Sequence, residues 1–127
     1  MGIKMLSQLS RNEDIGNICG AVSPGSHCPL FGVIMSASLV GDLAVLVCGG
    51  TECCSNVKNQ QHIQGLGFVL HTFTLEDIDI IFGVREKLAE ALRQMHRAVG
   101  CRAVMLVSSC IPEMTGEDLR LAIDDAA

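Results

Sequence analysis

Two uninterrupted apolar runs, at residues 43–48 (LAVLVC) and 103–107 (AVMLV), are the strongest constraint on how this chain can fold. Each run has the length of a typical strand, and neither alternates apolar with polar residues. Such runs are typical of parallel strands that are covered on both faces. Residues 67–73 (GFVLHTF) indicate a further strand. The sequence therefore predicts an α/β fold with an open, mainly parallel sheet flanked by helices.

Helices are predicted before, between and after these strands. Residues 84–99 give the clearest pattern, because apolar residues recur at helical spacing and a glycine follows. A helix opened by a proline is expected within 29–40, and the polar stretch 51–64 indicates a short helix. Pro112 is expected to break the chain, and Thr115 to cap a last helix together with the aspartate three residues later.

Length and composition indicate one domain. Residues 1–27 are rich in turn-forming residues and predict an irregular lead-in, so the single α/β domain is expected at 28–127. A net charge of −5 and the absence of Trp and Tyr argue against binding to nucleic acid or to an anionic membrane surface. The apolar stretch 30–50 contains Gly41 and Asp42 in its middle, which argues against a membrane span. Since no signal-peptide pattern opens the chain, a cytoplasmic location is expected.

Seven cysteines in such a chain favour metal or redox chemistry over a disulfide framework. Cys53 and Cys110 each follow an apolar strand, and ligands in open α/β sheets collect beyond the carboxyl ends of strands. Cys28 precedes a helix N-terminus, where amide dipoles favour a thiolate or an anionic cluster. Iron–sulfur clusters use cysteine thiolates as ligands, and the pair Gly49-Gly50 would let the backbone approach such a cofactor. These residues form the candidate site.

Four segments, taken together and in order, resemble a known family. They are CPLFG at 28–32, CGGTEC at 48–53, TLEDIDIIFGVREKLAEAL at 74–92 and SSCIPEMTGEDL at 108–119. They are similar to segments of the component 1 family of nitrogenase, which includes the dark-operative protochlorophyllide reductases and the reductive cyclase of coenzyme F430 synthesis. The chain departs from the family pattern in having Cys48 for a histidine, and Glu52 and Val84 for glycines.

The resemblance implies a fold, a cofactor and partners. Cys28, Cys53 and Cys110 match the cysteines that hold the P-cluster ([8Fe–7S]) or an equivalent [4Fe–4S] cluster at a subunit interface. The resemblance also implies a Rossmann-like domain, a homo- or hetero-dimer, and a separate ATP-dependent iron protein that delivers electrons to it. Cys54 adjoins Cys53 and remains an alternative ligand. Because family members carry further domains that build the catalytic pocket, no catalytic residue is assigned in this chain, which is expected to be an electron-transfer part of an oxidoreductase.

The same residues also have simpler interpretations that involve no iron–sulfur cluster. The cysteines could be ordinary buried thiols, as we expect for Cys19 and Cys101, and the chain a non-catalytic scaffold or binding module that carries zinc or no metal. A flavodoxin-like binder is a weaker alternative, because neither a dinucleotide fingerprint nor a P-loop is present. His27 is expected to be a solvated loop residue. The acidic residues at 76–79 are interpreted as a helix N-terminal turn.

Overall fold

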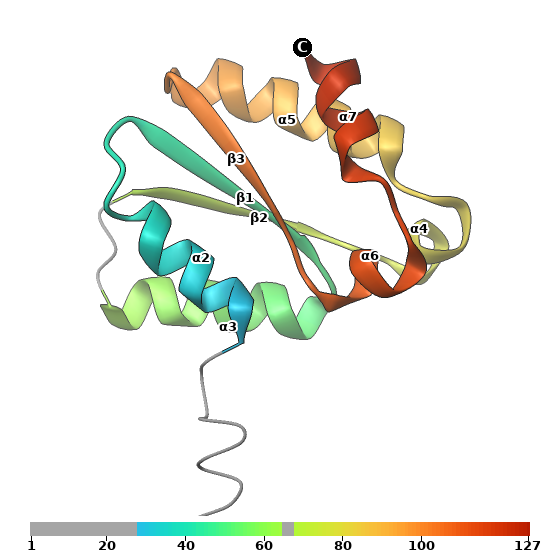
Figure 1. Cartoon of the computed structure of the whole chain (residues 1–127), viewed down its shortest axis with the longest axis horizontal. Helices are drawn as coiled ribbons and strands as arrows, with labels where there is room; N and C mark the ends of the chain where they lie inside the picture. The colour runs from blue at the N-terminus through green and yellow to red at the C-terminus, as the bar shows by residue number, and fades with distance from the viewer. Residues whose placement is uncertain (1–27, 65–67) are drawn as a thin grey trace, which may run out of the picture.

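The computed structural model describes residues 28–64 and 68–127, and the expected lead-in at 1–27 lies outside this part (Figure 1). Helices and strands follow one another along the described chain. In order they are α2 (Pro29–Ala37), β1 (Leu43–Gly49), α3 (Thr51–Gln64), β2 (Val69–Thr74), α4 (Asp77–Phe82), α5 (Arg85–Val99), β3 (Ala103–Ser108), α6 (Cys110–Thr115) and α7 (Leu119–Ala126).

The three strands form one open parallel sheet in the order β2-β1-β3. The predicted α/β fold with a parallel sheet is therefore confirmed. In β1, the central strand, every residue after the first is buried. This explains why its sequence is continuously apolar, because helices cover the sheet on both faces. Cys48 near the end of β1 is opposite Phe73 of β2 and Ser108 of β3.

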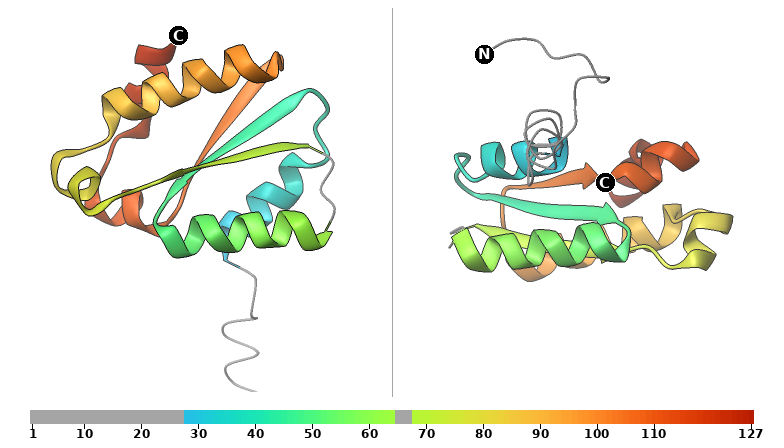
Figure 2. Two further views of the ribbon diagram at one scale, coloured as in Figure 1. Left: turned by 180° about the vertical axis from the view of Figure 1, so that it is seen from behind. Right: turned by 90° about the horizontal axis from the view of Figure 1, so that it is seen from below.

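Two hydrophobic clusters hold the helices to the sheet, one on each face (Figures 1 and 2). Alternate residues of β1 point to opposite faces, so Val45 and Val47 join one cluster while Ala44 and Leu46 join the other. The first cluster includes residues of α2 and α3, and we call this side of the sheet the α2–α3 face. The second cluster includes residues of α5 and α7, and α7 packs mainly against α5.

The segment after β3 differs from the prediction. Thr115 does not cap the last helix: it is the last residue of α6, and its hydroxyl donates a hydrogen bond to the Ile111 carbonyl at 3.1 Å. The N-cap of α7 is Asp118, whose carboxylate accepts the Arg120 N–H at 3.0 Å. Pro112 lies in the first turn of α6 instead of breaking the chain, since N–H groups in that turn have no intrahelical partner for the proline to remove.

The acidic segment after β2 is the start of a helix, as expected. Glu76 is the N-cap of α4, and its side chain and that of Asp79 form a reciprocal capping box. Gly83 then adopts a φ of +83°, which favours glycine, whereas Val84 has a φ of −121° and a buried side chain. Valine in place of the second glycine of the family motif is thus compatible with the backbone.

Candidate functional site

The helices α3 and α6 begin next to each other at the carboxyl edge of the sheet. Both follow neighbouring parallel strands, β1 and β3, and Cys48 near the end of β1 is in register with Ser108, the last residue of β3. The N–H of Ser109 continues this pairing beyond β3 by donating to the Cys48 carbonyl at 2.9 Å. Cys53, the third residue of α3, and Cys110, the first of α6, are therefore presented from adjacent connections.

The pair Gly49-Gly50 allows these connections to approach one another. A Cβ atom on Gly49 would lie 2.7 Å from the Ser109 Cβ and 3.7 Å from the Cys53 Cβ. A Cβ on Gly50 would lie 2.5 Å from the Ile111 Cδ1. The backbone at these two glycines thus lies close to side chains of the protein itself. The predicted role of Gly49 and Gly50 beside a cofactor stays a prediction.

The three predicted ligand cysteines all lie at or near a helix start. Cys28 is exposed and is the N-cap residue of α2, with extended backbone and no side-chain capping hydrogen bond. Figures 1 and 2 show the chain entering α2 at the same edge of the molecule at which α3 and α6 begin. Cys110 is exposed and Cys53 is half-buried. Cys53 also lines an open surface hollow with Glu52, Asn56 and other polar residues of α3.

Cys54 and Cys48, by contrast, are enclosed by the protein. Cys54 is 2 % exposed, and its Sγ lies 3.4 Å from the Gly49 carbonyl oxygen and 3.7 Å from that of Phe73. Burial raises the pKa of the Cys54 thiol. Burial, together with the nearby Cys54, raises the pKa of Cys48 to about 12. Both groups are therefore protonated thiols at neutral pH, and Cys101 is also buried in the core.

The donor set suits an iron–sulfur cluster better than a single ion. Among the side chains that the structure describes, no three from His, Cys, Asp or Glu lie close enough together to hold one metal ion. A cluster presents several irons, so its thiolate ligands need not converge on one point. Beside these thiols lies the Ser109 hydroxyl, which is buried and has no hydrogen-bond partner among the described residues. Soft thiol donors and an unpartnered hydroxyl at one edge are compatible with such a cofactor.

Other groups considered as ligands have structural partners or solvent exposure. Asp79 belongs to the capping box of α4 and pairs with Lys87. His71 and His96 are exposed, whereas His27 and Cys19 lie outside the described residues. No helix of the described chain is long and apolar enough to cross a membrane.

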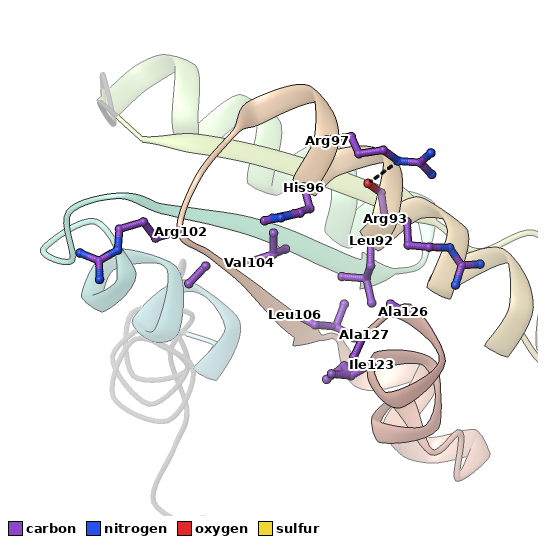
Figure 3. Close-up of a pocket in the computed structure, with 11 residues that line it drawn as sticks. Leu92, Arg93, His96, Arg97, Arg102, Val104, Leu106, Ile123, Ala126 and Ala127 are labelled. Carbon is purple, nitrogen blue, oxygen red and sulfur yellow. Dashed lines mark hydrogen bonds between the residues drawn. The ribbon is translucent and has the colours of Figure 1, made fainter.

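An apolar hollow lies in a different part of the molecule (Figure 3). It has a volume of about 490 Å³ and lies between α5, β3 and α7. Leu92, Val104, Leu106 and Ile123 form its apolar wall, and arginines line its rim. None of the described cysteines lines it, so the hollow and the thiol site are separate features.

Comparison with known proteins identifies the family. The family model for the nitrogenase component 1 type oxidoreductases matches residues 28–127. The chain belongs to this family. The predicted relationship is thereby confirmed. Membership of this family of nitrogenase-like proteins implies a metal-cluster cofactor in general terms, without specifying the cluster type.

Individual relatives of this component 1-type domain share less than a third of its residues over the aligned part. The nitrogenase iron-molybdenum cofactor biosynthesis protein NifE of Nostoc sp. is 27% identical over 115 residues, covering 85% of this chain and 23% of the relative. NifE of Rippkaea orientalis is 30% identical over 103 residues, covering 76% and 22%. Component CfbD of the Ni-sirohydrochlorin a,c-diamide reductive cyclase complex of Methanothermobacter thermautotrophicus is 28% identical over 82 residues, covering 65% and 22%. The chain thus spans less than a quarter of the length of these relatives.

Proposed function

We propose that this domain binds an iron–sulfur cluster through Cys28, Cys53 and Cys110 and serves in electron transfer within a nitrogenase-like oxidoreductase. The observation that supports the proposal is that a component 1-type domain presents three accessible or half-buried thiols at helix starts, two of them, Cys53 and Cys110, on adjacent connections at the carboxyl edge of the sheet. A cluster of the [4Fe–4S] or [8Fe–7S] type would use such thiolates as ligands.

Cys53 is the proposed ligand in preference to Cys54. The Cys53 side chain is half-buried and lines a surface hollow, whereas the Cys54 thiol lies inside the protein against two backbone carbonyls. Burial disfavours the Cys54 thiolate, and the thiolate is the form that binds iron. Cys54 therefore supports the start of α3, and Cys53 faces the cofactor.

A dimer interface is the proposed location of the cluster. Cys28 and Cys110 are exposed, so their sulfur atoms could reach a cluster that a second subunit also ligates. Large apolar side chains are exposed on α4 and α6, which contact each other: Ile81, Phe82 (80 % exposed) and Met114. Burying such a patch against a second subunit, identical or related, would be favourable. An ATP-dependent iron protein would then dock on the assembled pair and supply electrons.

A second candidate function is a scaffold or binding module that carries zinc or no metal. One observation favours the form without metal: the described side chains contain no group of three ligands placed to hold a single ion. Thiolates also suit zinc. Colourless protein with stoichiometric zinc, or protein with no metal, would identify this second function.

The proposed ligands are tested by substitution in the full chain, reconstituted with iron and sulfide without oxygen. We expect visible absorption that dithionite bleaches. Cys28→Ala, Cys53→Ala and Cys110→Ala should each lower both the absorption and the iron content. Cys54→Ala and Cys101→Ala serve as controls and should keep them, because both thiols are enclosed by the protein. Equal colour in all five variants would contradict the ligand assignment.

A further inference from the structure

Ser109 carries a buried hydroxyl that has no hydrogen-bond partner among the described residues. The residue is 5 % exposed, and its Oγ is one of two buried side-chain polar atoms lacking a hydrogen bond in the described part of the chain. The other is Oγ1 of Thr72 in β2. A buried hydroxyl without a partner costs free energy, so its retention at a functional edge calls for an explanation.

The position of Ser109 relates its hydroxyl to Cys53. The Ser109 side chain occupies the space where a Cβ of Gly49 would lie, and the Cys53 Cβ is 3.7 Å from that same point. Ser109 directly precedes Cys110, so it lies between two of the proposed ligands. Ser109 lies two residues after Val107, and residues two apart along an extended strand point to the same face. Because Val107 and Cys53 both belong to the cluster on the α2–α3 face, the Ser109 side chain points to that face as well.

The neighbouring serine shows that this arrangement is specific to one position. The Ser108 hydroxyl donates a hydrogen bond to the Glu113 carboxylate. Because side chains alternate along a strand, Ser108 points to the opposite face from Ser109. The Ser108 hydroxyl therefore has an acceptor within the protein, whereas the Ser109 hydroxyl has none among the described residues.

We propose that the Ser109 hydroxyl donates a hydrogen bond to the Sγ of Cys53 when Cys53 is a cluster ligand, and that this bond sets the reduction potential of the cluster. The inference rests on the proposed function. A thiolate is a stronger acceptor than a neutral thiol, so the bond forms with the ligated sulfur. A hydrogen bond to a ligand sulfur stabilises the more negative, reduced cluster and raises its potential. Ser109 is thus a positioning residue.

The experiment measures the midpoint potential of the reconstituted full chain by spectroelectrochemistry, alongside its iron and sulfide content. Ser109→Ala should shift the potential to a more negative value while iron and sulfide stay unchanged. Ser108→Ala should leave the potential unchanged, since that hydroxyl is bonded to Glu113. Thr72→Val, which removes the other unpartnered hydroxyl, should also leave it unchanged.

The outcomes separate this inference from the proposed function. A cluster that forms in Ser109→Ala with an unshifted potential overturns the role of Ser109 and leaves cluster binding intact. Lower iron content at an unchanged potential would make Ser109 a structural residue and also overturn the role. An unsubstituted chain that assembles no cluster overturns the proposed function and, with it, this inference.

Discussion

At the residue scale, Gly49 is a position where the end of β1 lies against the start of α3 and against Ser109, the residue before α6. Its missing side chain leaves the space that the Ser109 side chain fills, and that packing determines how near Cys53 and Cys110 can lie. The sequence predicts that the Gly49-Gly50 pair approaches a cofactor, and this stays a prediction, whereas the approach seen at Gly49 is to the protein's own side chains. The position of Cys53 and Cys110 beyond the ends of strands could be predicted from the apolar runs that precede them. The buried Ser109 hydroxyl could not, because its burial depends on how β3 pairs with β1.

Substituting Gly49 should therefore disturb the site through packing. Gly49→Ala places a Cβ 2.7 Å from the Ser109 Cβ, and we expect a loss of about 1–3 kcal/mol in the free energy of unfolding. Gly32→Ala is the matched control, since it lies in α2 with no atom within 4 Å of the new Cβ, and it should stabilise by about 0.5–1 kcal/mol. Urea unfolding measures both changes, and equal effects would contradict the packing argument.

The carboxylate of Asp79 makes the stability of the fold depend on pH in the acidic range. Lys87 Nζ lies 2.5 Å from the carboxylate and the Glu76 N–H donates to it at 3.1 Å, and these contacts hold the pKa of Asp79 below its usual range. A depressed pKa in the folded state stabilises the fold above the unfolded-state value of about 3.9. This stabilisation is lost as pH falls through the folded-state pKa.

Asp79→Asn should remove this acid-dependent contribution. We expect it to lower the free energy of unfolding at pH 7 by about 1 kcal/mol, a small value because Lys87 is largely exposed. The stability of the variant should also fall less between pH 5 and about pH 3 than that of the unsubstituted chain. Lys87→Met should reproduce much of the effect at pH 7. Denaturant midpoints measured across this pH range test the prediction, which parallel curves for variant and unsubstituted chain would refute.

At the scale of elements, strands were more predictable than short helices. The runs at 43–48 and 103–107 correspond to β1 and β3 because a strand covered on both faces needs apolar residues throughout. The helix α3 extends over Thr51–Gln64 although its sequence is mostly polar. Among its residues with described burial only Cys54 and Val57 are buried, which is too narrow a stripe to give a clear helical period. α6 was missed because its proline was interpreted as a break.

The capping of α7 distinguishes the structure from the sequence-based expectation. Asp118→Ala removes the carboxylate that accepts the Arg120 N–H, and we expect it to cost about 0.5–2 kcal/mol. Thr115→Ala should cost less, because the Thr115 hydroxyl bonds only to carbonyls of its own helix, those of Ile111 and Pro112. Thermal or urea unfolding compares the two. A larger loss for Thr115→Ala would indicate that the cap lies at Thr115 after all.

At the scale of the whole molecule, the parallel sheet explains why residues far apart in sequence gather at one edge. The connections that follow β1, β2 and β3 reach the same side of the sheet, because parallel strands have their carboxyl ends together (Figure 1). The family and the fold class could be predicted from four short motifs and the apolar runs. The strand order β2-β1-β3 could not, since neighbouring strands in a sheet are not fixed by their order along the chain.

The most direct test of the account is the amount of iron, sulfide and zinc per chain in protein purified without oxygen, measured together with the mass in solution. The account predicts iron and sulfide in comparable amounts, little zinc, and a mass of at least two chains of 13.5 kDa when the cluster is bound. Protein that holds neither iron nor sulfide after reconstitution, or that holds stoichiometric zinc as a monomer, would contradict it.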